Sequence, residues 1–159
     1  MKLVSRDSEK LVVRMDSREY DALRAAVALR GHLPRKARPL TSDTAVPPVL
    51  RDAEKDLSEA LRDHRRELTE GVDALLSDPV RCVVQTRGAR ILSLSPSDAE
   101  LLLQTLNDLR LSAWERLGCP DFEAGDRPEV TDDNFLCLWA LQVTDLFLAF
   151  LLTGLHGEP

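Results

Sequence analysis

The segment NFLCLWALQVTDLFLAFLLTGL, residues 134–155, decides the fold, because it is apolar around the whole circumference of a helix. Such a helix is either fully buried or spans a membrane. Its length permits a span, but Asp145 near the middle costs about 3 kcal/mol in lipid, and neither end carries a nearby Lys or Arg to set a topology. We therefore predict no membrane insertion, and we expect a helix central to the core or shared with a second subunit in a homodimer.

The helix before it is predicted over residues 96–117. Ser95 is its expected N-cap, Pro96 takes the first position and Asp98 the third, a pattern that resembles a capping box. Gly118 follows the last helical residue and predicts the C-terminal end. The two helices are joined by an acidic, turn-rich loop over residues 119–133.

An arginine stands on the leucine face of this penultimate helix. At 100° per residue, Arg110 falls on the edge of the buried arc, whereas Asp108 faces outward. A buried guanidinium needs a partner, and Asp145 is the one ionised group among the apolar residues of the last helix. We predict that Arg110 pairs with Asp145 and that Asn107 completes the network. A rival arrangement lays Arg110 across Trp114 with its head in solvent.

The rest of the chain predicts two β-hairpins and two more helices. The first hairpin covers 2–5 and 11–15, and its helix 17–30 begins at a capping box and ends before Gly31. Residues 31–48 carry four prolines and predict a mobile loop. A second helix over 49–77 and a hairpin over 81–86 and 90–94 follow. The second helix is expected to pack one face along its length, through Leu50, Ala53, Leu57, Leu61, Leu68, Val72 and Leu75.

These elements predict an α+β fold, a mostly helical single domain over residues 1–159 with about four helices. The two short hairpins are expected to join into one small sheet, and the apolar C-terminal helix is expected to be central to the core.

Composition bears on the function classes. The net charge is −6 and aromatic residues make up 4%, which disfavours nucleic-acid binding. Seven isolated glycines provide no phosphate-binding loop, and the histidines and cysteines lack metal-site spacing, so we predict no cofactor and no metal. Three cysteines without a paired spacing predict reduced thiols and a cytoplasmic location. Bases dominate residues 1–50, ten against six acids, whereas acids dominate residues 91–159, twelve against three bases.

The segment LLLQTLNDLRLSAWERLG, residues 101–118, resembles a bacterial family found mainly in actinobacteria, domain of unknown function 2017. The matching residues share the pattern L-N-D-x-R-L followed by R-L-G, and they are Leu106, Asn107, Asp108, Arg110, Leu111, Arg116, Leu117 and Gly118. The family has no established activity. Its genes tend to accompany that of the Clp protease adaptor, so the resemblance implies a cytosolic accessory role in protein turnover.

We therefore expect a non-enzymatic cytosolic interaction protein with a protein partner, and the resemblance makes the Clp protease system the candidate partner. The partner would meet the polar face of helix 96–117 and the acidic loop, or the basic loop 31–48. The alternative is an enzyme or a binder of a small anionic ligand, with a pocket around Arg110 and Asp145. The candidate binding residues are Asn107, Asp108, Arg110 and Asp145, and no catalytic residue is assigned.

Overall fold

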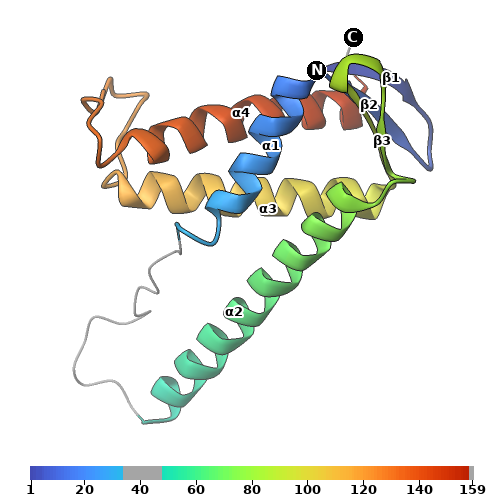
Figure 1. Cartoon of the computed structure of the whole chain (residues 1–159). Coiled ribbons are helices and arrows are strands. Elements are labelled where there is room, and N and C mark those ends of the chain that lie inside the picture. Colours follow the sequence, from blue (N-terminus) through green and yellow to red (C-terminus); the bar gives the residue numbers. More distant parts are fainter. Residues whose placement is uncertain (34–47, 158–159) are drawn as a thin grey trace.

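The structure is a computed structural model that describes residues 1–33 and 48–157, with side chains described in the second range from residue 52 onward. Its elements, shown in Figure 1, run in the order β1 (Lys2–Arg6), β2 (Leu11–Met15), α1 (Ser17–Leu29), α2 (Pro48–Ser77), β3 (Cys82–Val84), the short 3-10 helix η1 (Thr86–Gly88), β4 (Arg90–Leu94), α3 (Pro96–Arg116) and α4 (Phe135–His156). The predicted α+β class with four helices is confirmed. The predicted mobile loop 31–48 lies mostly outside the described residues.

The two predicted hairpins join into one antiparallel sheet of order β1-β2-β4-β3. Strands β2 and β4 are the central pair, with Leu11 opposite Leu94 and Met15 opposite Arg90. Side chains alternate along β2, so that Leu11, Val13 and Met15 are buried while Arg14 is exposed. The buried face of the sheet packs on the main hydrophobic cluster, to which α1, α2, α3 and α4 all contribute.

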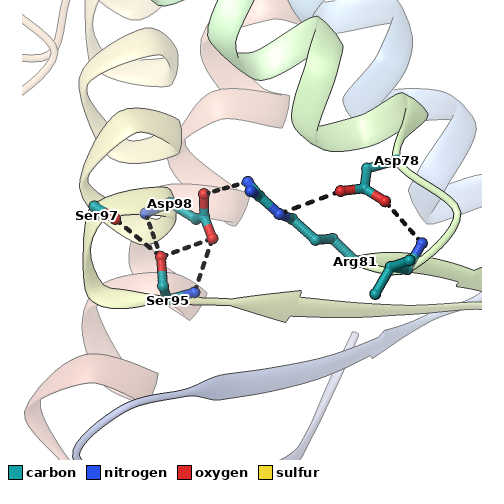
Figure 2. A network of polar contacts seen from close by, with 6 residues as sticks. Asp78, Arg81, Ser95, Ser97 and Asp98 are labelled. Atoms are coloured by element: carbon teal, nitrogen blue, oxygen red, sulfur yellow. Dashed lines mark hydrogen bonds and ion pairs between the residues drawn. The ribbon is translucent and has the colours of Figure 1, made fainter.

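Both helices that follow a central strand begin at a capping box. Asp16 and Glu19 form it at α1, and Ser95 and Asp98 form it at α3. Figure 2 shows a further contact at the start of α3, where the Arg81 guanidinium lies between the carboxylates of Asp78 and Asp98, 3.3 and 2.9 Å away. The C-terminal end of α2 is thereby held against the first turn of α3.

Helices α3 and α4 lie side by side, and α1 crosses them (Figure 1). Small residues line the contact, since Ala26 of α1, Ala113 of α3 and Ala140 of α4 are all buried in one cluster. Short side chains let the three helix backbones approach closely. Helix α1 therefore packs on both α3 and α4, whereas α2 packs mainly on α3.

The prediction that α2 packs along its whole length is wrong. Its C-terminal part buries Leu68, Val72 and Leu75, but Leu57 and Leu61 are exposed, as is Ala53. In Figure 1 the N-terminal half of α2 projects away from the other helices. A helical period reports which face is apolar, but the length of the neighbouring helices decides how much of that face is covered.

The expected place of α4 in the core is confirmed, but within one chain only one side of the helix is buried. It is long and apolar enough to cross a membrane, a property that core helices of soluble proteins share, and 33% of its most apolar window is buried. Its buried residues lie on one side, which faces α1, α3 and the sheet; they are Cys137, Ala140, Leu141, Thr144, Phe147, Leu151 and Gly154. The opposite side is exposed, with Leu146 at 60%.

Candidate functional site

The polar residues of the family-like segment lie on opposite sides of α3. Positions 108 and 110 are two residues apart, so their side chains leave the helix about 200° apart. Arg110 faces α4, whereas Asp108 faces α1 and α2. The four candidate residues therefore do not form one cluster.

The predicted contact between Arg110 and Asp145 is present. Nη1 of Arg110 lies 3.5 Å from Oδ1 of Asp145. The pair is at the surface, however, with side chains 43% and 60% exposed, and not buried among the apolar residues of α4. Nε of Arg110 is buried without a hydrogen-bond partner, so the stem enters the protein while the head reaches solvent. An exposed pair at this distance contributes about 0.5 kcal/mol or less.

Asn107 does not complete this network. Its side chain is exposed, and it forms no side-chain hydrogen bond with any other described residue. The rival arrangement is absent from the described residues, in which no cation–π contact joins Arg110 and Trp114. The indole Nε1 of Trp114 donates to the carbonyl of Pro120 at 3.0 Å. That bond holds the start of the 119–133 loop against α3. The cation–π contact found in the described structure joins Arg90 and the Tyr20 ring, 4.8 Å apart.

Asp108 is the centre of a contact that joins three helices, and the prediction that it faces outward is wrong. Its Oδ2 accepts from Nε of Arg30 at 3.1 Å, and its Oδ1 accepts from Nε of Arg65 at 3.2 Å. Nη1 of Arg30 also donates to the Thr69 hydroxyl at 2.7 Å. We call these four residues, Arg30, Arg65, Thr69 and Asp108, the Asp108 cluster.

The Asp108 cluster is well shielded from solvent. The Arg30 side chain is 5% exposed and that of Asp108 is 18% exposed, whereas Arg65 covers the outer side at 30%. A buried guanidinium is tolerated only with a counter-charge, and a single carboxylate serves both arginines here. Nη2 of Arg30 is buried, and it has no hydrogen-bond partner among the described residues. The geometry indicates a structural junction among the end of α1, the middle of α2 and the middle of α3.

Sequence reasoning missed Arg30, Arg65 and Thr69. Arg30 stands at the C-cap of α1, and Arg65 belongs to a charged run of α2 that reads as a solvated face. One signal was available, because Arg65 and Thr69 are spaced by four residues and flank the buried Leu68. Which carboxylate they meet depends on how three separate helices pack.

The acidic loop 119–133 uses its acids to form its own turns. The Asp121 carboxylate accepts from the backbone of Glu123 and Ala124, and the Asp126 carboxylate accepts from the Asp121 backbone at 2.7 Å. Arg127 donates to the Phe122 carbonyl at 3.1 Å. All six carboxylates remain exposed, so the loop presents a negative surface beside the N-terminal end of α4.

The groups available for chemistry are few in the described part of the chain. Burial raises the pKa of the Cys82 and Cys137 thiols, which keeps both protonated and unreactive near neutral pH. Over residues 1–33 and 48–157 there is no group of three His, Cys, Asp or Glu side chains placed to hold a metal ion.

Comparison with known proteins supplies the family. No curated protein and no solved structure matches the chain. The family model of a domain of unknown function, DUF2017, matches residues 1–156, which is nearly the whole of the 159 residues. The match extends far beyond the L-N-D-x-R-L segment and includes the sheet and all four helices. The chain therefore belongs to the DUF2017 family.

Proposed function

We propose that this protein is a non-enzymatic cytoplasmic accessory protein that binds a protein partner through the projecting half of α2. The observation that carries the proposal is an apolar stripe on that half, which is exposed in the described part of the chain. Leu57 and Leu61 are 44% and 45% exposed, and Ala53 and Ala60 beside them are exposed as well. We call Ala53, Leu57, Ala60 and Leu61 the α2 stripe.

The α2 stripe has the geometry of a helix that docks in a groove. Positions 53, 57 and 61 are each four residues apart, so their side chains lie along one side of the helix. Charged residues of both signs occupy the opposite side, including Lys55, Glu59 and Arg66. Partner grooves read such helices through apolar anchors at this spacing.

The partner class that we propose is a component of Clp-type protein turnover. This class is what the family resemblance noted in the sequence implies, through the tendency of the family's genes to accompany that of the Clp protease adaptor. The support is an association and not a contact, so the binding surface and the partner are tested separately below.

The alternative, a pocket for a small anion around Arg110 and Asp145, has less support. The guanidinium of Arg110 already faces the Asp145 carboxylate at 3.5 Å, and that negative charge opposes a bound anion. Both side chains are also too exposed for the water-excluding environment that makes anion recognition strong.

The proposal is tested by capture of partners from the native cell with the tagged full chain, followed by quantitative mass spectrometry. We expect a specific partner with the wild type and its loss with Leu57→Glu, which places a charge in the α2 stripe. The matched control is Lys55→Glu, which adds a carboxylate on the opposite side of the same helix. Both positions are exposed, so both variants should keep the wild-type stability within about 0.5 kcal/mol.

Two results would overturn the proposal. Capture that is unaffected by Leu57→Glu would remove the α2 stripe as the docking surface. The turnover assignment would be removed if the captured partner has no connection with Clp components and purified Clp adaptor fails to bind the wild type. That outcome would leave the α2 stripe as the docking surface.

A further inference from the structure

The outer side of α4 is an apolar surface that the described structure leaves partly uncovered. The residues on this side share an arc of about 160° on the helical wheel. Among its large side chains, Phe135, Leu146 and Leu152 are 52%, 60% and 44% exposed. Only two polar residues, Gln142 and Asp145, interrupt its central part. We call this surface the α4 outer face; its apolar members are the exposed Phe135, Leu146, Ala149 and Leu152 and the half-buried Leu138, Trp139 and Phe150. Monomeric proteins rarely leave a continuous apolar surface of this kind in water.

The two ends of α4 carry opposite charge. The acidic loop 119–133 precedes its N-terminal end and holds six carboxylates against one arginine. Its C-terminal end lies against the β1–β2 hairpin, where Gly154 meets the Leu11 side chain and Gly157 lies at the Arg6 guanidinium. The hairpin is basic, with Lys2, Arg6, Lys10 and Arg14 all exposed against Asp7 and Glu9. Figure 1 shows the C-terminal end of α4 beside these strands. The molecule is therefore dipolar along the axis of α4.

This charge distribution selects the occupant and its orientation. We propose that two copies of the chain form a homodimer through their α4 outer faces, with the two helices antiparallel about a two-fold axis. In that arrangement the acidic loop of each copy meets the basic hairpin of the other, and the attraction occurs twice. A parallel arrangement would instead bring acidic loop to acidic loop and hairpin to hairpin.

The middle of α4 fits this arrangement. The helix runs from 135 to 156, so the two-fold axis passes close to Asp145 and Leu146. Two bare carboxylates near the axis would repel each other, but each Asp145 has Arg110 of its own chain at 3.5 Å. The Gln142 amide both donates and accepts, so it tolerates a polar neighbour from the second copy. The Arg110–Asp145 pair, which adds little to the stability of one chain, then neutralises the centre of the interface.

The area of the α4 outer face shows why the acidic loop and the hairpin are needed for a stable dimer. A helix of 22 residues is about 33 Å long, and at about 10 Å of contact width it offers on the order of 300 Å². A stable interface needs about 800 Å² from each partner. The loop and the hairpin at the two ends have to supply much of the difference, so charge changes there should weaken the dimer measurably.

This inference goes beyond the proposed function, since it concerns α4 and not the α2 stripe. The first test is the mass in solution, by sedimentation equilibrium of the full chain from about 1 to about 100 µM, a range in which an interface of this size assembles. We expect twice the 17.8 kDa of one chain for the wild type. Leu146→Glu should give a monomer with unchanged circular dichroism and thermal midpoint, because Leu146 is 60% exposed. Leu57→Glu, the same substitution at an exposed leucine of α2, should remain a dimer.

The second test addresses the antiparallel orientation. Lys10→Glu in the hairpin and Glu129→Lys in the acidic loop should each weaken the dimer by about tenfold, because each puts like charges together at both ends. An equimolar mixture of the two variants should recover wild-type affinity as a mixed dimer, since opposite charges then meet again at both ends.

Several results would overturn the inference. A wild type that stays monomeric at the highest concentration removes the dimer, and its sedimentation with phosphatidylcholine vesicles would assign the α4 outer face to lipid instead. Equal effects of Leu146→Glu and Leu57→Glu remove this face as the interface. A mixture of Lys10→Glu and Glu129→Lys that fails to recover affinity removes the antiparallel orientation. None of these results depends on capture of a partner through the α2 stripe.

Discussion

Replacement of Asp108 by Asn should destabilise the protein strongly, although Asp108 lies within two residues of the weakly coupled Arg110. The substitution keeps the shape of the side chain and removes its charge. Arg30, whose side chain is 5% exposed, then loses its only carboxylate in the Asp108 cluster, and Arg65 loses the same partner. Removing one member of a buried ion pair costs about 3–5 kcal/mol, because the remaining charge stays buried. Since Asp108 and Arg65 retain some solvent contact, we expect about 3 kcal/mol.

The measurement is urea unfolding of the full chain at pH 7, followed by circular dichroism at the helix band. In a thermal unfolding experiment on a chain of this length, the same loss of about 3 kcal/mol would lower the thermal midpoint by about 6–12 °C. The matched control is Asp145→Asn, which makes the same chemical change in a pair whose members are 43% and 60% exposed. We expect it to cost about 0.5 kcal/mol or less.

A double variant separates the ion pair from other effects of the substitution. Arg30→Met removes the buried charge itself, so Arg30→Met combined with Asp108→Asn should cost less than the sum of the single variants, by about 1–3 kcal/mol. The reasoning is refuted if Asp108→Asn lies within about 1 kcal/mol of the wild type, or if Asp145→Asn costs as much.

Three further predictions concern the start of α3, the reactivity of the thiols and the pH dependence of stability. Ser95→Ala should lower the free energy of unfolding in urea by about 1 kcal/mol, because it removes the N-cap acceptor for the backbone of Asp98; an unchanged midpoint would contradict this. Cys119, which is half-buried, should react with a thiol reagent much faster than the buried Cys82 and Cys137, and equal rates for all three would count against the structure. Because burial raises the pKa of the Cys82 and Cys137 thiols in the folded state, the unfolded state loses these protons first, so stability should fall as pH rises past the ordinary thiol pKa of about 8.5. Stability that stays level from pH 8, about 0.5 unit below that pKa, to pH 10, about 1.5 units above it, would contradict the sign.

The parts of the fold that local chemistry controls could be predicted from the sequence. Both capping boxes place the helix starts after Asp16 and Ser95, and Gly118 follows the end of α3. The β-prone runs at 11–15 and 90–94 identified β2 and β4, and the join between the hairpins occurs at that central pair. The contact of Arg110 with Asp145 also followed, because each of those helices offered one charged group on its apolar side.

What could not be predicted depends on where the elements end relative to one another. Leu57 continues the same apolar stripe as Leu68 but extends past the helices that would cover it. Leu146 is as apolar as Leu151 and differs from it only in the side of α4 that it occupies. The Asp108 cluster joins positions 30, 65 and 108, and no local pattern relates residues so far apart in the chain.

The projecting half of α2 also determines the valency that an assembly of this protein would have. Residues 48–64 lie beyond the junction at Arg65 and extend about 25 Å as a helix, at 1.5 Å per residue. A partner bound near Leu57 therefore does not cover the α4 outer face. In a homodimer each copy would contribute one such arm, so a partner with two grooves would be bound at both, and the second attachment would occur at the high local concentration set by the first. Weak binding by one arm would then suffice for a long-lived complex.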